Sequence, residues 1–189
     1  MTNLEFIFPE IFLSLSIMFL LILGVFKNDS SKLIHNLSSI VLLITAVITF
    51  NETLGIKKTF LFNESIVIDY LSSFMKIVTL IAAFLVLIIS SNYLKIIKIF
   101  KIEYSILILS SVLGMMIMIS SNDLIVFYMG LELQSLALYV LATFNRDQLK
   151  SSEAGLKYFV LSALSSGLLL YGCSLIYGFT GSTNFNLIA

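Results

Sequence analysis

The hydrophobic residues of this chain fall into six long runs separated by short polar connectors. Each run is close to the ~20 residues that a helix needs to cross the ~30 Å hydrocarbon core of a bilayer. The runs cover residues 7–26, 33–50, 70–91, 104–120, 124–144 and 158–179. This pattern predicts an all-α polytopic membrane protein with about six transmembrane helices. A single transmembrane domain then spans residues 1–189.

The longest connector, residues 51–69, has a pattern of its own. It mixes polar residues with two short apolar runs at 60–62 and 66–68. Two such runs joined by a few polar residues are typical of a small hairpin. A hairpin or a re-entrant turn is therefore expected between the second and third helices.

Composition and charge agree with a membrane protein and predict its orientation. Hydrophobic residues make up 59% of the chain and charged residues 12%, about half the usual share in soluble domains. The first, third and fifth loops, with the start of the sixth helix, hold eight basic residues, whereas the other side holds only Lys57 and Lys58. This bias predicts that the odd-numbered loops face the cytoplasm or matrix and that both termini face the other side. The net charge of zero gives no indication of a nucleic-acid partner.

Glu132 is the first candidate for chemistry, because it lies inside the apolar run 124–144. An acid at membrane depth costs roughly 3 kcal/mol on insertion scales, and such residues are usually functional. At ~100° per residue, four polar side chains share its helix face. They are Tyr128, Ser135, Tyr139 and Thr143. The stripe is how a proton path would be built, although a protonated acid that only holds helices together would also fit.

The other polar residues have simpler readings. Asp123 precedes the fifth helix and is expected to cap it. Lys76 lies only ~9 Å along its helix, so it is expected to extend to the membrane surface rather than to be buried. For Lys157, extension to the membrane surface and a buried role are equally expected. The small pairs Ser162/Ser166 and Ala163/Gly167 predict close helix packing rather than chemistry.

Several kinds of redox and catalytic site are excluded for this chain alone. Cys173 is the only cysteine and His35 the only histidine, so the chain can form neither an intrachain disulfide, a cysteine-ligated iron–sulfur cluster nor a bis-histidine haem site. Cys173 is expected to pack as a small apolar residue. The sequence has no glycine-rich phosphate loop and no Ser-His-Asp set. We therefore expect no cofactor, no metal and no catalytic residue in this chain.

A resemblance to a known family adds to this reading. The fifth-helix segment carries SNDLI at 121–125, YMGLELQSL at 128–136 and ALYVL at 137–141. The match continues through FNRD at 144–147, SEAGLKYF at 152–159, GLLLYG at 167–172 and IYGFTG at 176–181. These motifs resemble the N-terminal part of NADH-quinone oxidoreductase subunit N, called subunit 2 in mitochondria, an antiporter-like membrane-arm subunit of respiratory complex I. A weaker likeness extends over the rest of the chain.

The resemblance implies a role in proton translocation coupled to quinone reduction, as part of a proton-translocating NADH:ubiquinone reductase. The family's glutamate on the fifth helix falls on Glu132, and its lysine on the sixth falls on Lys157. The first three helices, within residues 1–91, would precede the antiporter-like repeat. The start of this repeat would span residues 104–179, and a C-terminal connector would follow at 180–189. FMN, iron–sulfur clusters and ubiquinone are expected elsewhere in the complex.

The family's later helices, with their buried lysines, have no counterpart in this sequence. The bundle is therefore expected to be incomplete, and an inverted-repeat site needs both halves. The expected partners are the lipid bilayer, other membrane-arm subunits and a second polypeptide that carries the missing helices of a split subunit. The expected location is the mitochondrial inner membrane, with the bacterial plasma membrane as the alternative. A component of a monovalent cation/proton antiporter and a structural membrane-arm segment without transport remain alternative functions.

Overall fold

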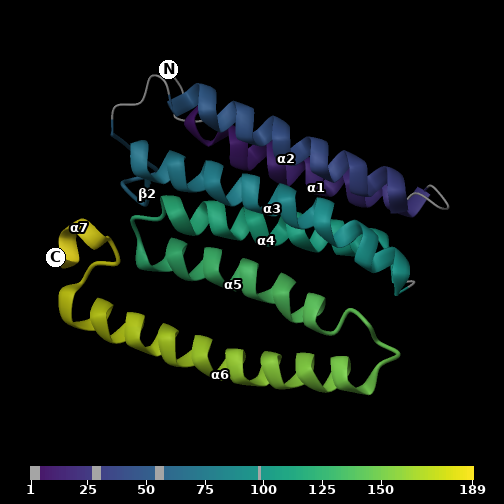
Figure 1. Ribbon diagram of the computed structural model, residues 1–189. Coiled ribbons are helices and arrows are strands. Elements are labelled where there is room, and N and C mark those ends of the chain that lie inside the picture. Colours follow the sequence, from purple (N-terminus) through teal and green to yellow (C-terminus); the bar gives the residue numbers. More distant parts are fainter. Residues whose placement is uncertain (1–4, 27–30, 54–57, 98) are drawn as a thin grey trace.

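The computed structural model describes residues 5–26, 31–53, 58–97 and 99–189. Within these ranges the chain folds as an up-and-down bundle of long helices (Figure 1). Six of them are long and apolar enough to cross a membrane, which confirms the predicted number of spans. They are α1 (Phe8–Phe26), α2 (Ser31–Thr53), α3 (Tyr70–Ile96), α4 (Ile102–Ser120), α5 (Leu124–Ala142) and α6 (Leu149–Thr180). A 3₁₀ turn, η1 (Glu5–Ile7), precedes α1, and a short helix, α7 (Phe185–Ile188), ends the chain.

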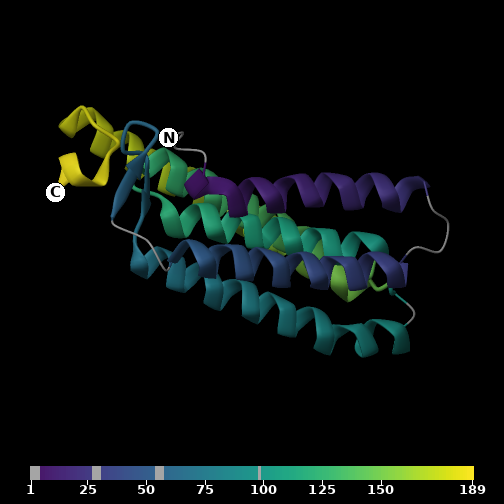
Figure 2. The same cartoon turned by 90° about the horizontal axis from the view of Figure 1, so that it is seen from above.

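The predicted hairpin is present between α2 and α3. Strands β1 (Thr59–Leu61) and β2 (Ile66–Ile68) are antiparallel, and Phe60 pairs with Val67. At its tip, Phe62, Asn63 and Glu64 have positive φ angles of 50°, 53° and 67°. The hairpin stands at the same end of the bundle as α7 (Figure 2).

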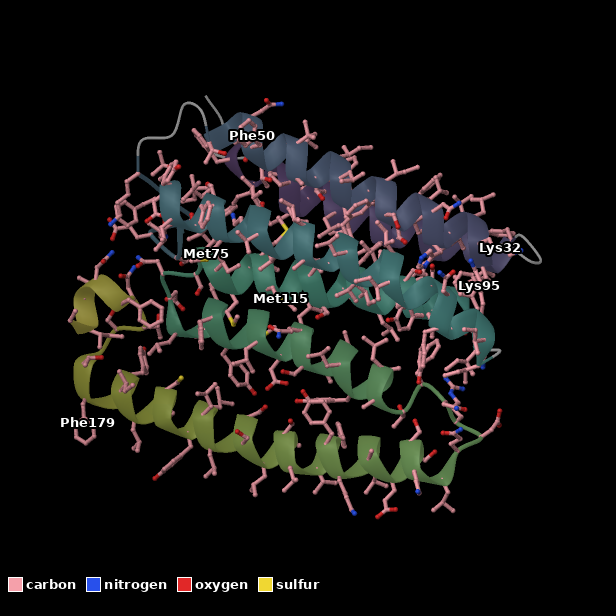
Figure 3. The ribbon with its side chains drawn as sticks, viewed as in Figure 1. Lys32, Phe50, Met75, Lys95, Met115 and Phe179 are labelled. Atoms are coloured by element: carbon pink, nitrogen blue, oxygen red, sulfur yellow. The ribbon has the colours of Figure 1, made fainter. Side chains whose placement is uncertain are left out.

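The two ends of the bundle differ in charge. Lys32 and Lys95 lie at one end, whereas Phe50 and Phe179 lie at the other, with the hairpin and α7 (Figure 3). The bias in basic residues between the two sets of loops, which predicted the orientation, therefore corresponds to two opposite ends of the folded bundle. Which end faces the cytoplasm stays a prediction from the positive-inside rule.

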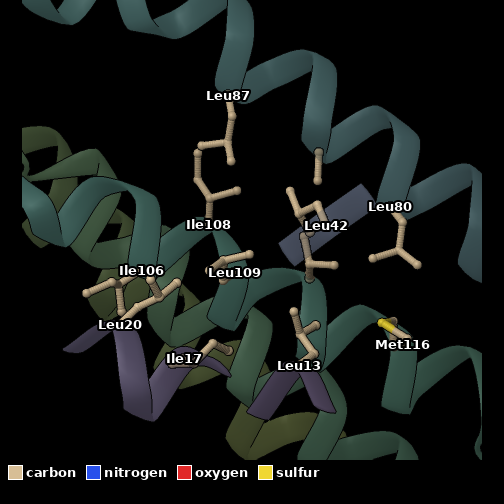
Figure 4. Packing of buried hydrophobic residues seen from close by; sticks show 12 residues of the cluster. Leu13, Ile17, Leu20, Leu42, Leu80, Leu87, Ile106, Ile108, Leu109 and Met116 are labelled. Atoms are coloured by element: carbon tan, nitrogen blue, oxygen red, sulfur yellow. The ribbon is translucent and has the colours of Figure 1, made fainter. Parts of the chain in front are cut away.

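The hydrophobic core lies among the first four helices. Leu13, Leu42, Leu80, Leu87 and Leu109 are each fully buried and come from α1, α2, α3 and α4 (Figure 4). Burying a leucine side chain is worth about 1.5–3 kcal/mol in water, but within a bilayer close packing rather than exclusion of water holds such helices together. This core is the fixed part against which α5 rests.

Two glycines bring α4 and α5 into backbone contact. A Cβ atom on Gly114 would lie 2.6 Å from the backbone nitrogen of Gln134, and one on Gly130 would lie 2.8 Å from that of Met118. Small residues permit this close approach of membrane helices. The contact fixes the rotation of α5, and it therefore fixes the direction in which Glu132 points.

A hydrogen-bonded cluster joins the hairpin, the α4–α5 turn and the C-terminal segment. The backbone N–H of Asn122 donates to Ser65 O (2.8 Å) and its Nδ2 donates to Glu64 O (2.8 Å). On the other side, Phe185 N–H donates to Asn122 O (3.0 Å) and Leu124 N–H donates to the carbonyl of residue 183 (2.9 Å). Two segments that are distant in the sequence are thus tied to one turn.

The predicted helix cap is confirmed, and it has a second function. Asp123 Oδ1 accepts from the backbone N–H of Ile125 (2.8 Å), as expected for a residue that caps α5. Its other oxygen accepts from the Thr183 hydroxyl. Gly181, with φ of 71°, ends α6 in the left-handed conformation and turns the chain back toward this cap. One aspartate therefore holds both the start of α5 and the segment that follows α6.

Candidate functional site

Glu132 occupies the middle of α5. It lies ~12 Å from the first residue of the helix and ~15 Å from the last, at ~1.5 Å per residue. Its Oε1 atom is buried and has no hydrogen-bond partner among the described residues. Buried polar atoms in proteins are nearly always paired with protein or water. This oxygen is therefore placed to exchange a hydrogen bond or a proton with something outside the described chain.

The rest of the predicted stripe follows Glu132 along α5. Tyr139 is 7% exposed, and Tyr128 and Ser135 are half-buried. The Ser135 hydroxyl donates to the Leu131 carbonyl (2.7 Å), as serines in helices commonly do. Its oxygen still has room to accept another hydrogen bond. The stripe is thus a row of hydroxyl groups on the side of α5 that faces α6.

A small polar cleft of about 130 Å³ lies between α5 and α6. Serines and Tyr139 give it five hydroxyl groups, among leucines. Its lining is Leu131, Ser135 and Tyr139 from α5, with Ser162, Ser165, Ser166 and Leu169 from α6. At about 30 Å³ per water molecule the cleft has room for about four. Hydroxyl groups and water together form hydrogen-bonded chains along which protons move.

The Ser162/Ser166 pair does not pack closely against another helix of the described chain. The two serines line an open space instead, and their packing against further helices stays a prediction. The close contact between α5 and α6 is made elsewhere: a Cβ atom on Gly155 would lie 1.8 Å from Thr143 Cγ2. Helices that touch near their connecting loop and not farther along leave a hollow, and small side chains do not fill it.

Aromatic rings separate the cleft from the α5–α6 loop. The ring of Tyr139 meets those of Tyr158 and Phe159 edge to face, with centroid distances of 4.8 Å and 5.8 Å. Because α5 and α6 are antiparallel, these rings lie between the serines of the cleft and the basic loop.

Lys157 is not in contact with Glu132. Its ammonium pairs with Glu153 at 2.6 Å, and the two side chains are 67% and 53% exposed. Glu132 and Lys157 therefore form no direct salt bridge. The sixth helix begins at Leu149 rather than near Ser152, so Lys157 lies ~12 Å into it. Its side chain leans back toward the loop, as helical side chains do.

The structure corrects the prediction for Lys76. It does not extend to the membrane surface but is 3% exposed, and its ammonium lies 2.5 Å from Glu10 Oε1. Both α1 and α3 start at the hairpin end, so Glu10 lies ~3 Å and Lys76 ~9 Å into their helices. Because a lysine side chain leans toward the start of its helix, it reaches the acid rather than water.

The outer face of α6 is uncovered in the structure. Gly155 is the one buried residue among those of α6. Leu156, Leu164 and Leu168 are 65%, 65% and 64% exposed. A Cβ atom on Gly167 would meet nothing within 4 Å. Lipid or further helices must cover this face in a bilayer.

The described residues offer no metal centre. They contain no group of three or more His, Cys, Asp or Glu side chains that would hold an ion. His35 Nδ1 forms a hydrogen bond with Ser105 Oγ at 3.0 Å, and Cys173 is a half-buried free thiol. Both are accounted for as packed side chains.

Comparison with known proteins places this geometry in a family context. The family model described as NADH:quinone oxidoreductase/Mrp antiporter, transmembrane, matches residues 121–189, which include α5 and α6. NADH-quinone oxidoreductase subunit N of Pelagibacter ubique is 71% identical over 188 residues, covering 100% of this chain. The same subunit of Maricaulis maris is 51% identical over 99% of the chain. The chain resembles the N-terminal part of NADH-quinone oxidoreductase subunit N.

A solved structure of a complex I chain has the same fold as this chain. Respiratory complex I from Thermus thermophilus contains a chain that superposes with a TM-score of 0.79 and 25% identity, covering 93% of this chain and 38% of that one. The present chain spans about two-fifths of the subunit N relatives that it matches, 40% and 39% for the two named above. The resemblance predicted from the motifs is thereby confirmed, and so is the antiporter-like character of the incomplete helical bundle.

Proposed function

We propose that this chain forms the N-terminal part of a proton-translocating membrane-arm subunit of NADH:quinone oxidoreductase. Its relatives carry the name of subunit N of that enzyme. The observation that carries the proposal is Glu132: a buried carboxyl oxygen without a partner among the described residues, in the middle of a membrane helix. It lies one turn from Ser135, which lines the cleft of hydroxyl groups. Flavin, iron–sulfur and quinone chemistry belong to other subunits in this proposal.

Glu132 is the group that binds and releases the proton. A proton arriving through water in the cleft forms an O–H bond with the carboxylate, and the water molecule that gave it up takes another from its neighbour. The hydroxyls of Ser135 and Tyr139 both donate and accept, so they are suited to hold such water molecules in line. Tyr128, on the opposite side of Glu132 along α5, is proposed to support the path toward the hairpin end.

Lys157 is proposed to act at a distance. Its positive charge, on the exposed face of α6, favours the ionised form of Glu132 only weakly, and Glu153 offsets part of that charge. A change in the Glu153–Lys157 pair would alter the field at Glu132 without direct contact. Lys157 is then an electrostatic modulator at the loop side of the path.

Further helices are proposed to cover the outer face of α6. The exposed leucines and the open space at Gly167 form a face suited to close helix packing. In the subunit N relatives, about 60% of the length lies outside the match, as the coverage of 40% implies. The covering helices are carried either by a longer form of this chain or by a second polypeptide, as a split subunit would require.

The bacterial plasma membrane is the proposed location. The subunit N relatives named above are bacterial, which supports this alternative over the mitochondrial inner membrane. With basic loops toward the cytoplasm, the hairpin, α7 and both termini face the periplasm. Protease accessibility of a tag after residue 189 in spheroplasts, against inverted vesicles, tests this orientation.

A second candidate, a component of a monovalent cation/proton antiporter, is supported by the family description, which names both kinds of protein. The two differ in their partners. Co-purification of the chain with NADH:quinone oxidoreductase activity supports the first function, whereas sodium- or potassium-dependent proton exchange in its absence supports the second.

The deciding experiment measures proton pumping in the assembled enzyme carrying Glu132→Gln. We expect full assembly with a lowered proton-to-electron ratio, and a milder loss in Glu132→Asp, which retains a titratable group. Glu64→Gln, an exposed acid at the hairpin tip, is the matched control and should pump normally. An assembled Glu132→Gln enzyme with the parental ratio would remove Glu132 from the path.

A further inference from the structure

A second group of buried charges lies far from the cleft, at the hairpin end of the first three helices. Glu10 of α1 and Lys76 of α3 form the ion pair described above, with side chains 11% and 4% exposed. The pair uses only one oxygen of Glu10. The other, Oε2, is buried and has no hydrogen-bond partner among the described residues.

A third charged group completes the cluster. Glu52, half-buried near the end of α2, is close enough to Glu10 and Lys76 for charge interactions with both. Among the described residues, the ionisable groups that lie near one another here are therefore Glu10 from α1, Glu52 from α2 and Lys76 from α3. From α4 and the hairpin, the surroundings are serine and apolar side chains. Two acids thus lie near one base, which pairs directly with Glu10.

A cavity of about 280 Å³ gives this cluster access from the hairpin side. Its lining is mostly apolar and extends to Phe62 and Ile66 of the hairpin, and Glu10, Ser14 and Ser120 are its polar members. At about 30 Å³ per water molecule it has room for several. A water molecule there can reach the hairpin end of the bundle without crossing the core.

The charges of the cluster do not balance when all three groups are ionised. Glu10 and Lys76 cancel, and Glu52 leaves one negative charge in partly buried surroundings. An uncompensated charge in partly buried surroundings is unfavourable. Binding one proton removes that charge, and like-charged carboxyls in one site commonly share a proton in this way.

We propose that Glu10, Glu52 and Lys76 form a second proton-binding site, loaded from the hairpin side and independent of Glu132. In the loading step, a hydronium ion in the cavity transfers its proton to Oε2 of Glu10, the acid of the cluster that lines the cavity. One O–H bond forms, one breaks, and a water molecule remains. The cluster then changes from a net charge of −1 to zero.

A purely structural ion pair would join α1 to α3 and do nothing else. That reading explains Glu10 Oε1 and Lys76, but it accounts neither for the second acid nor for the unpaired Oε2 beside a cavity. The two readings differ in one measurable property, because only the proton-binding site contains a protonated carboxyl group at neutral pH.

The test is infrared spectroscopy of the full chain in lipid bilayers at neutral pH, in a Glu132→Gln background so that Glu132 contributes nothing. The carbonyl stretch of a protonated carboxylic acid, identified by its shift in deuterated water, reports the bound proton. Glu10→Gln and Glu52→Gln should each remove this signal, because one acid and one base then balance. Lys76→Met should increase it about twofold, because both acids must then be protonated.

Matched variants keep the result interpretable. Glu64→Gln alters an exposed acid and should leave the signal unchanged. Lys76→Arg retains the positive charge and should also leave it unchanged, which covers the case in which Lys76→Met fails to fold. Unchanged signals in both Glu10→Gln and Glu52→Gln, with helix content preserved, would show that the cluster holds no proton and only ties α1 to α3. Because Glu132 is absent throughout, this result says nothing about the proposed proton path on α5.

Discussion

The two faces of α5 show how the same chain builds a rigid contact and an open one. On the α4 side, Gly114 and Gly130 bring two backbones together, and no side chain separates them. On the α6 side, the helices touch at Gly155 and Thr143 and then leave a cleft lined with hydroxyl groups. Small residues serve both purposes. Glycine permits backbone contact, whereas serine leaves polar groups facing a space that water can enter.

This comparison explains where Glu132 is placed. The α4 contact fixes the rotation and height of α5, so the acid has a defined position. The α6 cleft offers hydroxyl groups and space for water. In the proposed function, the rigid support and the hydrated approach that such an acid needs lie on different faces of one helix.

The largest effect is expected from filling the α4–α5 contact. Gly114→Val places a branched side chain where even a Cβ atom lies 2.6 Å from backbone. The helices must separate, and we expect a destabilisation of more than about 3 kcal/mol, seen as loss of folded chain from the membrane. The control is Gly167→Val, since that position has nothing within 4 Å.

In the chain alone, Gly167→Val should give parental yield and a parental thermal unfolding profile. Equal losses in the two variants would contradict the distinction between a rigid and an open face. A Gly167→Val chain that folds but no longer assembles would sharpen the distinction, because it would show that further helices pack on the outer face of α6.

A smaller effect is expected from changing the cleft. Tyr139→Phe keeps the ring contacts with Tyr158 and Phe159 but removes a hydroxyl group from the lining. Losing one hydrogen bond of about 1 kcal/mol corresponds to roughly a fivefold slower proton transfer through this path. Proton uptake by the assembled enzyme in vesicles measures it, with Tyr158→Phe as the control for removing a nearby hydroxyl outside the cleft. Slowing by Tyr158→Phe alone would place the path elsewhere.

The smallest effect is expected from Lys157. Lys157→Ala should slow turnover less than Glu132→Gln, because the lysine lies on the exposed face of α6 and pairs with Glu153. Lys157→Arg preserves the charge and should be nearly silent. Steady-state NADH:quinone oxidoreductase activity and proton pumping of the assembled enzyme are the measurements. A loss in Lys157→Arg as large as in Glu132→Gln would indicate that the lysine itself carries the proton.

The features that follow from local sequence were predictable. The six apolar runs predicted the helices, the spacing of two short runs predicted the hairpin, and Asp123 before an apolar run predicted a cap. Each depends on neighbouring residues. The depth of Glu132 and its polar stripe also follow from helical periodicity along α5 alone.

The features that depend on distant residues were not predictable. Lys76 was expected at the membrane surface because it lies shallow enough in α3 to reach it. The sequence of α3 alone does not indicate that Glu10 faces Lys76 from α1. Ser162 and Ser166 are compatible with close packing or with a cleft. Which of the two forms depends on the distance between α5 and α6. One local signal was available for the ion pair: an acid in the first turn of α1 and a lysine in the second turn of α3, on helices that start at the same end.

The central claim is that water reaches Glu132 through the cleft between α5 and α6. A high-resolution cryo-electron microscopy structure of the assembled complex tests it most directly. We predict ordered water molecules in the cleft, hydrogen-bonded to Tyr139 and the serines, and one within hydrogen-bond distance of Glu132. A dry cleft, filled by side chains of a covering helix that also pair both oxygens of Glu132, would contradict the account.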